Sequence, residues 1–329
     1  MKRKILDVKN LSTSFKNNKQ KIVTVDNISF EVFEGETLGI VGESGCGKSL
    51  TSLSVMGLIK PPGEVKADAI LFDDIDLSGV SKKKFRGLRG NQLSMIFQEP
   101  MTSLNPVYKV GDQIGESLKI HKSLSKAERH AVIVNLLKEV GIARAAEIAD
   151  CYPHQLSGGM RQRVMIAIAI ACNPKLIIAD EPTTALDVTI QAQILELLKK
   201  LQRENNTAMI LITHDLGVVS EACDRVLVMY AGRIVESGEV KSVLSNPLHP
   251  YTKGLLASLP KNTPPQSKLP FIPGQVPPPV SWGKGCRFAD RCPFAEEKCK
   301  TEQPPFFQAA DEKQVACWLY EEERTVVNA

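Results

Sequence analysis

The chain has 329 residues and a formal net charge of +4; 43% of its residues are hydrophobic and 24% are charged. This composition provides enough apolar material for a core, so it excludes a disordered or fibrous chain, and the charge is too balanced to indicate a nucleic-acid-binding protein. No segment reaches the ~20 apolar residues that a transmembrane helix needs. The N-terminal sequence MKRKILDVKN has no apolar signal-peptide core, so we expect a cytosolic protein with reduced cysteines.

Along the chain, strands come first and then alternate with helices. From residue 107 to about 148, helical spacing and many charges predict a helical insertion. The predicted helical subdomain that contains it spans about residues 100–165. This order predicts an α/β fold with a mainly parallel sheet. The expected strands are 5–8, 22–25, 37–41, 176–179 and 208–213, and the expected helices are 111–120, 126–140, 143–149, 157–172 and 190–203.

The composition changes after about Pro247. Residues 260–279 contain eight prolines, a density that neither a helix nor a central strand tolerates. The sequence therefore predicts a globular domain at 1–245, a proline-rich linker or wrapping arm at 246–284, and a small segment at 285–329 that holds four cysteines.

Residues 42–49, GESGCGKS, match the pattern G-x-x-x-x-G-K-[ST] and lie between an expected strand and an expected helix. Glycines let the backbone turn tightly and direct N–H groups at phosphate oxygens, and the helix N-terminus adds positive partial charge. We call these residues the phosphate loop. Its candidate nucleotide-binding residues are Gly42, Ser44, Gly45, Cys46, Gly47, Lys48, which reaches the β- and γ-phosphates, and Ser49, whose hydroxyl binds Mg²⁺.

A second candidate element is the apolar strand at 176–179, which is followed by two carboxylates. Asp180 is the expected Mg²⁺ ligand, directly or through water. Glu181 follows it, where an attacking water could lie. Together with the phosphate loop, this pair predicts a P-loop nucleotide-binding protein.

Residues 156–163, LSGGMRQR, resemble the signature sequence of the ATP-binding-cassette (ABC) ATPases. The other elements of that family also appear in its order along the chain. Phe15 resembles the aromatic residue that stacks on adenine, Gln98 the Q-loop glutamine and His214 the switch histidine. The resemblance covers about residues 3–245. It implies a P-loop ABC-type nucleotide-binding domain with a helical subdomain.

The signature predicts a second anion site. Ser157 can cap the helix that begins there, while Gly158 and Gly159 allow a close approach of backbone amides. One nucleotide cannot easily use both sites of one chain. The resemblance implies a head-to-tail dimer, in which each ATP lies between one chain's phosphate loop and the other chain's signature.

The resemblance also implies a mechanism with ATP and Mg²⁺. Glu181 acts as general base on the attacking water, and His214 orients the γ-phosphate and that base. Gln98 binds Mg²⁺ beside Ser49 and Asp180 and couples hydrolysis to whatever docks on the helical insertion.

Three segments resemble the ATPases of oligopeptide and dipeptide importers: 97–106, FQEPMTSLNP; 246–252, NPLHPYT; and the pairs Gly285-Cys286 and Cys292-Pro293. Nickel and glutathione importers share much of this pattern, so they remain alternatives, as does a soluble ABC ATPase of DNA repair or translation. The resemblance implies an ATPase coupled to peptide transport, peripheral at the cytoplasmic face of the cell membrane. Its partners would be a second ABC ATPase subunit (a sister chain, or alternatively a second copy), two membrane permease subunits and, indirectly, an extracytoplasmic solute-binding protein, with no nucleic acid.

A small segment with little apolar material holds four cysteines, Cys286, Cys292, Cys299 and Cys317. Such a segment needs a covalent or metal cross-link to hold a fold. Their spacings, C-x₅-C, C-x₆-C and C-x₁₇-C, lack the close pair that is usual at a zinc site. Four thiolates also suit a [4Fe–4S] cluster. The resemblance to the C-terminal cysteines of peptide-importer ATPases favours the cluster, with zinc and free thiols as alternatives.

Overall fold

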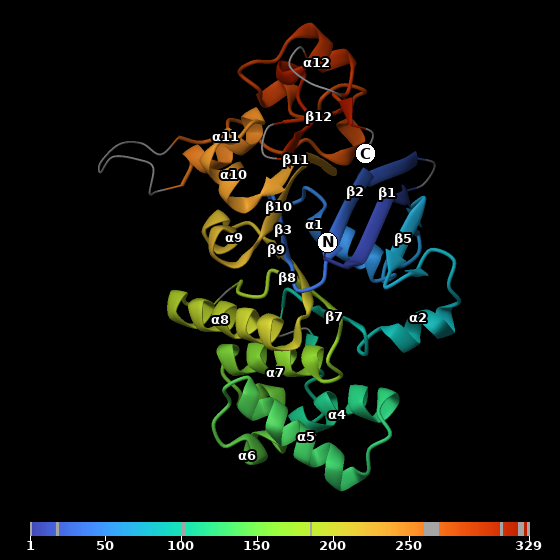
Figure 1. The fold of residues 1–329 in the computed structure, drawn as a ribbon, viewed down its shortest axis with the longest axis vertical. Helices are drawn as coiled ribbons and strands as arrows, with labels where there is room; N and C mark the ends of the chain where they lie inside the picture. The colour runs from blue at the N-terminus through green and yellow to red at the C-terminus, as the bar shows by residue number, and fades with distance from the viewer. Residues whose placement is uncertain are drawn as a thin grey trace. The chain divides into compact units, whose positions relative to one another are not determined.

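The computed structural model describes residues 2–17, 20–99, 103–184, 186–259, 270–309, 312–321 and 326–327. Residues 100–102 of the importer-like segment and 260–269 of the predicted arm lie outside these ranges. The chain forms two compact units. Figure 1 shows its helices and strands, coloured from blue at the N-terminus to red at the C-terminus. The loop unit comprises Leu6–Glu31, Thr37–Ser78 and Thr213–Ala329, and the helical unit comprises Met1–Ile5, Val32–Glu36 and Gly79–Ile212.

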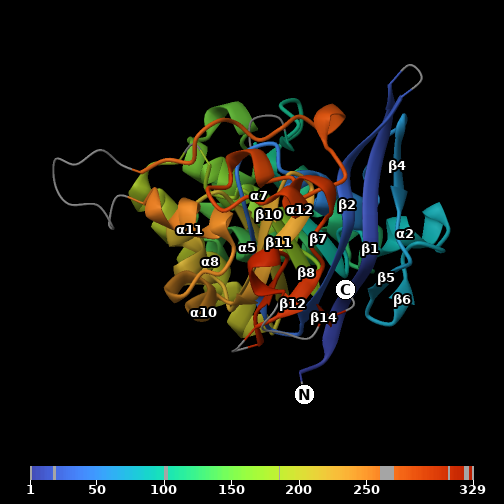
Figure 2. The ribbon, with the colours of Figure 1, turned by 90° about the horizontal axis from the view of Figure 1, so that it is seen from above.

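The first sheet of the loop unit is antiparallel, with strand order β2-β1-β5-β6 and with β4 beside β1 (Figure 2). Ile70 and Phe72 of β5 are buried while their neighbours are only partly so, as alternation on a one-sided sheet requires. The two opening strands run much further than the expected 5–8 and 22–25. The bounds are β1 Lys4–Asn17, β2 Gln20–Phe33, β4 Gly63–Lys66, β5 Ala69–Phe72 and β6 Ile75–Asp76.

The second sheet of the loop unit begins with β3, Thr37–Val41, all five residues of which are buried. This strand pairs in parallel with β10, and the antiparallel strands β11, β13, β12 and β14 continue the sheet. The C-terminal residues thus extend the same sheet that carries the phosphate loop. The bounds are β10 Arg225–Tyr230, β11 Arg233–Glu239, β12 Phe306–Gln308, β13 Gln314–Val315 and β14 Val326–Val327.

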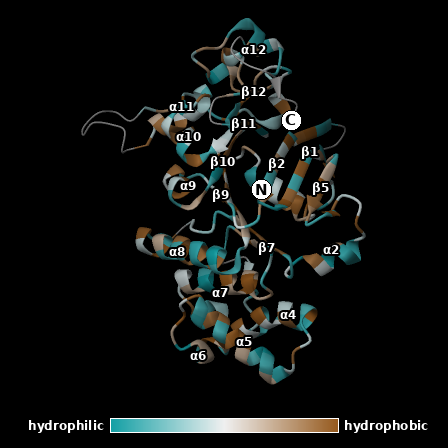
Figure 3. Cartoon of the chain, viewed as in Figure 1, coloured by the Kyte–Doolittle hydropathy of each residue, from teal (hydrophilic) through white to brown (hydrophobic). Residues whose placement is uncertain are grey.

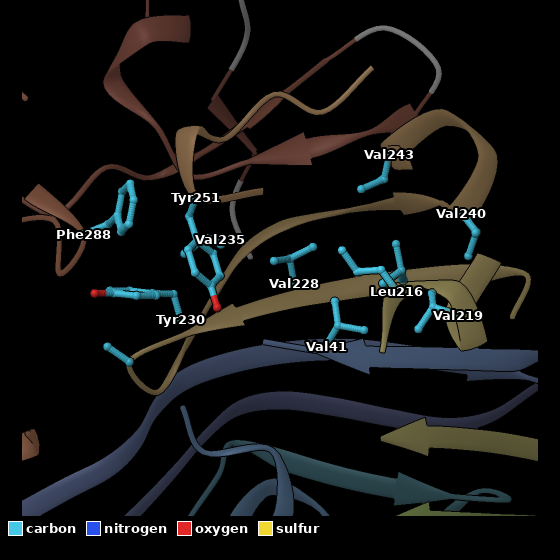
Figure 4. Packing of buried hydrophobic residues seen from close by; sticks show 12 residues of the cluster. Val41, Leu216, Val219, Val228, Tyr230, Val235, Val240, Val243, Tyr251 and Phe288 are labelled. Carbon is cyan, nitrogen blue, oxygen red and sulfur yellow. The ribbon is translucent and has the colours of Figure 1, made fainter. Parts of the chain in front are cut away.

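The helices of the loop unit are α1 Lys48–Val55, α9 Leu216–Ala222, α10 Val240–Ser245, α11 Pro250–Ala257 and α12 Glu297–Thr301. Helix α11 lies within the segment that the prolines predicted as an arm. Its Tyr251 is fully buried and belongs to one core with Val41, Val228, Tyr230 and Phe288 (Figure 4). This core joins the strand before the phosphate loop to the C-terminal residues.

The helical unit contains the parallel strands β9, β8 and β7, in that order. All five residues of β8 are buried, which explains its continuous apolar run. The parallel strands and the helices between them confirm the predicted α/β fold. The bounds are α2 Lys82–Leu88, β7 Leu93–Ile96, α4 Val110–His121, α5 Lys126–Glu139, α6 Ala145–Ala149, α7 Gly158–Ile170, β8 Leu176–Asp180, α8 Val188–Asn205 and β9 Ala208–Thr213.

Local signals account for the helices of this unit. Ser125 and Glu128 form a capping box that begins α5, and Asp187 caps α8 by accepting a hydrogen bond from the N–H of Ile190 at 3.0 Å. Figure 3 shows hydrophobic and hydrophilic residues mixed along α5 and α8. Within the described residues, no helix combines the length and the apolar character that crossing a membrane requires.

Candidate functional site

The phosphate loop connects β3 to α1, as predicted. All three of its glycines have a backbone conformation that favours glycine, with φ angles of 154° at Gly42, 79° at Gly45 and 105° at Gly47. A Cβ atom at Gly42 would also lie 2.1 Å from the carbonyl oxygen of Met229. Gly47 caps α1, so the loop delivers the chain directly into a helix N-terminus. The local geometry is therefore that of an anion-binding turn.

Lys48 is the first residue of α1 and is only 5% exposed. Its ammonium group donates hydrogen bonds to the carbonyl oxygens of Gly42 at 2.7 Å and of Glu43 at 3.1 Å. A cation buried this deeply requires such acceptors. The side chain thus lies along the inside of the loop, where a phosphate group would meet it.

The remaining predicted residues of the loop differ in exposure. Ser44 and Gly45 are exposed, Ser49 is half-buried and Cys46 is fully buried. Burial raises the pKa of the Cys46 thiol. The Cys46 side chain is therefore a neutral thiol, and its backbone N–H donates a hydrogen bond to the carbonyl oxygen of Glu43 at 3.3 Å.

Two further predicted residues belong to the loop unit. Phe15 lies in β1 and pairs with Gly63 of β4, and its ring is half-buried. His214 is exposed and follows β9. Asp215 caps the next helix by accepting hydrogen bonds from the N–H groups of Gly217 and Val218, which fixes the backbone beside His214.

The helical unit brings together Gln98 and Glu181. Strands β7 and β8 are parallel neighbours, so the residues that follow them meet at one edge of the sheet. The Gln98 amide donates to Glu181 Oε2 at 3.0 Å, and the Thr184 hydroxyl donates to the same oxygen at 2.8 Å. Asp180, at the end of β8, is 4% exposed. The contacts of Gln98 and Thr184 with Glu181 were not predicted, although Thr184 lies only three residues beyond Glu181.

The signature lies at the start of α7. Ser157 caps this helix by accepting a hydrogen bond from the N–H of Met160 at 3.3 Å, as predicted. Ser157 and Gly158 are exposed and Gly159 is half-buried. The helix N-terminus is thus open to a ligand from outside the chain.

The four C-terminal cysteines line one cavity of ≈ 50 Å³, together with His249, Phe288 and Trp318 among others. Burial raises the pKa of the Cys286 thiol to about 11 and that of Cys317 to about 12. In the part of the chain that the structure describes, no group of three or more His, Cys, Asp or Glu side chains is arranged to hold a metal ion. The structure therefore gathers these cysteines but does not by itself supply the predicted iron–sulfur or zinc site.

Comparison with known proteins agrees with this geometry. Residues 25–184 match the family described as "ABC transporter", and residues 235–299 match "Oligopeptide/dipeptide transporter, C-terminal region". The fold is similar to a dimeric post-hydrolysis structure of the ATP-binding cassette MJ0796 bound to ADP and Pi (TM-score 0.65, 29% identity, 71% of this chain and 98% of that chain). The fold and the phosphate loop thus define an ABC-type ATP-binding protein.

Two curated relatives narrow the class. The chain is 54% identical over 320 residues to the oligopeptide transport ATP-binding protein AppD of Bacillus subtilis (97% of this chain, 98% of that one). It is 50% identical over 313 residues to the dipeptide transport ATP-binding protein DppD of Escherichia coli (95% and 96%). The chain belongs to the family of ATP-binding subunits of oligopeptide/dipeptide ABC transporters.

Proposed function

We propose that the chain hydrolyses ATP to drive the import of oligopeptides or dipeptides through a membrane transporter. The observation that carries this proposal is the phosphate loop between β3 and α1, with Lys48 buried along its inner side. It occurs on a chain whose near-full-length relatives are peptide transport ATP-binding proteins. These relatives support peptides over nickel or glutathione, and over a role in DNA repair or translation.

The phosphate loop, with Lys48, holds the triphosphate, and Phe15 stacks on the adenine. Ser49 and Asp180 offer the oxygen donors that Mg²⁺ prefers, with Gln98 as a third. The ion keeps several waters and phosphate oxygens as ligands, so this small protein donor set fits it. When bound, Mg²⁺ offsets the charge that develops on the transferred phosphoryl group.

Glu181 is the proposed general base. Gln98 and Thr184 both donate to its Oε2 atom, and these two hydrogen bonds hold the carboxylate in one orientation. A base acts only within hydrogen-bond reach of the proton it takes, so this orientation is part of catalysis. His214 orients the γ-phosphate and the base.

The signature residues Ser157, Gly158 and Gly159 serve the ATP of a partner chain. The exposed position of Ser157 and Gly158 at the N-terminus of α7 supports this assignment. The partner is a sister ATPase, with a second copy of this chain as the alternative. Two membrane permease subunits and an extracytoplasmic solute-binding protein complete the transporter, which holds this chain at the cytoplasmic face of the membrane.

The four C-terminal cysteines are the proposed ligands of a [4Fe–4S] cluster, with zinc as the alternative. The donor set fits, because four thiols line one cavity and thiolates are the usual cluster ligands. Thiolates on one Zn²⁺ must converge at about 2.3 Å from the ion. A cluster is larger than one ion and leaves its ligands further apart. The two groups therefore require different separations between the four sulfur atoms.

The transport proposal is tested by solute competition. The intact complex is purified from host membranes by an affinity tag on this chain, and its subunits are identified. It is then reconstituted in proteoliposomes with ATP on the side of the membrane that carries the ATPase subunits. Uptake of a labelled peptide that unlabelled peptides suppress, but nickel and glutathione do not, is the expected result. Recovery of the chain without membrane subunits, or uptake of nickel or glutathione alone, would overturn it.

A further inference from the structure

The second residue of the phosphate loop, Glu43, is held by two residues from far along the chain. Its backbone N–H donates a hydrogen bond to the hydroxyl of Tyr251 in α11 at 2.8 Å. Its carboxylate accepts two hydrogen bonds from Arg291, Nη1 to Oε2 at 2.7 Å and Nη2 to Oε1 at 3.0 Å. This paired geometry is the strongest that a carboxylate and a guanidinium can form. Both the backbone and the side chain of Glu43 are thus fixed by residues beyond the predicted 1–245 domain.

Arg291 is itself held rigidly, with a side chain that is only 6% exposed. A guanidinium has five N–H donors. Besides Glu43, they serve the carbonyl oxygen of Pro273 at 2.8 Å, the hydroxyl of Tyr230 at 3.3 Å and the carbonyl oxygens of Ile272 and Gly274, both at 3.3 Å. The hydrogen bonds to Glu43 raise the pKa of Arg291 above its ordinary value. Arg291 therefore presents a permanent, oriented positive charge to the loop.

The aromatic residues around this contact hold it in the core of the loop unit. Tyr251 packs edge-on against Tyr230, with ring centroids 4.7 Å apart, and lies 5.5 Å from the ring of Phe288 (Figure 4). Phe288 lies three residues before Arg291 in the chain. A displacement of the C-terminal residues would therefore also displace the phosphate loop, because a closely packed core transmits strain.

The charge on Glu43 explains why this contact matters for a nucleotide. Glu43 directly follows Gly42 in the loop that is assigned to the phosphates of ATP. An unpaired carboxylate there would repel the triphosphate, whereas a carboxylate paired with Arg291 has its charge cancelled. The loop thus depends on a cation that it does not itself contain.

We propose that Arg291 is a positioning residue of the ATP site: by neutralising and orienting Glu43, it makes the C-terminal segment set the affinity of the phosphate loop for ATP. This inference rests on the proposed role of residues 42–49. It assigns the C-terminal segment a part in nucleotide binding that is independent of any metal at its cysteines.

The test measures the Kd of the purified full-length chain for a fluorescent ATP analogue with Mg²⁺. Arg291→Gln is expected to weaken binding about tenfold or more, as expected when one partner of a largely buried ion pair is removed. This deficit should shrink as salt rises, because the repulsion by Glu43 is then screened. The double variant Glu43→Gln with Arg291→Gln should regain binding to within about threefold of the wild type, since it carries no unpaired charge. A purely structural role for Arg291 would not be rescued in this way.

Two further variants serve as a charge-retaining comparison and as a control. Arg291→Lys retains the charge without the paired geometry. It is expected to bind between the wild type and Arg291→Gln, and it replaces the latter if circular dichroism shows that Arg291→Gln is unfolded. Lys298→Gln is the matched control, because Lys298 is also a cation beside a cysteine of this segment but pairs with Glu321, at 2.5 Å. Its Kd should equal that of the wild type.

Lys48→Ala, measured in parallel, separates this inference from the proposed function. If Lys48→Ala binds ATP as tightly as the wild type, the assignment of the phosphate loop is wrong. If Lys48→Ala binds weakly while Arg291→Gln binds like the wild type, the role of Arg291 alone is overturned. Failure of Glu43→Gln to rescue a folded Arg291→Gln variant would also overturn it.

Discussion

At the scale of single residues, the best-defined arrangement is the carboxylate of Glu181. The residue has a φ of 46°, in the left-handed region, and its N–H donates to the carbonyl oxygen of Ile212 at 2.9 Å. Strain of this kind persists only where the surroundings fix it, and it often accompanies function. With Gln98 and Thr184 on Oε2, the structure holds both the backbone and the side chain of the proposed base.

Glu181→Gln should abolish turnover and preserve ATP binding. The substitution removes the base but keeps the size of the side chain and leaves the phosphate loop intact. The expected loss of ATP hydrolysis is on the order of 10²-fold or more. Phosphate release by the assembled complex measures it, with the Kd for ATP as the control. Hydrolysis near the wild-type rate would exclude Glu181 as the base.

Thr184→Val tests the hydrogen bond that sequence reasoning missed. Without the hydroxyl, Glu181 keeps one of the two donors on Oε2, so we expect a fall in kcat with little change in the KM for ATP. The fall should be smaller than that of Glu181→Gln, because the base itself remains. An equal rise in KM would instead indicate a role in binding.

The sequence predicted the site residues that belong to short motifs. It did not predict contacts between residues that lie far apart in the chain. Gly42, Lys48, Asp180 and Glu181 lie in short patterns whose geometry is local. Arg291 and its partner Glu43 are 248 residues apart, so neither pattern nor spacing points to their pairing. For residues such as Arg291, only the folded chain reveals the contact.

At the scale of elements, two helix N-termini have different tasks. Helix α1 begins under the chain's own phosphate loop, while α7 begins at the exposed Ser157, where we propose that the ATP of a partner chain binds. Both provide the backbone N–H groups and the positive partial charge of a helix N-terminus, which attract an anion.

We therefore expect Lys48→Ala to weaken ATP binding by the isolated chain, whereas Ser157→Ala leaves that binding intact and impairs ATP-dependent dimerisation. Nucleotide titration of the isolated chain measures the first effect, and size-exclusion chromatography with ATP and the partner subunit measures the second. Equal loss of binding in both variants would contradict the head-to-tail assignment.

The C-terminal cysteines form the second group at this scale. If they hold a [4Fe–4S] cluster, the chain purified without oxygen should be brown and contain about four irons. Cys292→Ser should lose the colour and the iron while retaining ATP binding. Cys151→Ser, which changes a cysteine outside the four, should keep both. A colourless wild-type preparation with one zinc and no iron would decide for the alternative.

The predicted elements were most accurate where one physical signal dominates. Apolar runs correctly predicted the buried strands β3 and β8. The cap residue Ser157 correctly predicted the start of helix α7. Helix α11 was missed because the surrounding prolines indicated an arm. Pro250 is in fact placed at the start of the helix, where a proline lacks no needed N–H group. The short strands β13 and β12 depend on long-range pairing, β13 with β11 and β12 with β13, which no local pattern reveals.

At the scale of the whole molecule, the proposal requires a second chain, because the signature of one chain would complete the ATP site of the other. We expect the isolated chain to hydrolyse ATP slowly and the complete transporter to hydrolyse it much faster. Comparing turnover per chain in the two preparations measures this. The same turnover in both would indicate a stand-alone ATPase.

In the proposed function, ATP hydrolysis by this chain drives peptide import. The most direct measurement is uptake of a labelled peptide into proteoliposomes that contain the complete transporter, with ATP supplied on the side of the ATPase subunits. The wild-type chain should support uptake, and the same complex assembled with Glu181→Gln should bind ATP but take up no peptide. Equal uptake with the two chains would show that ATP hydrolysis by this chain does not drive peptide import.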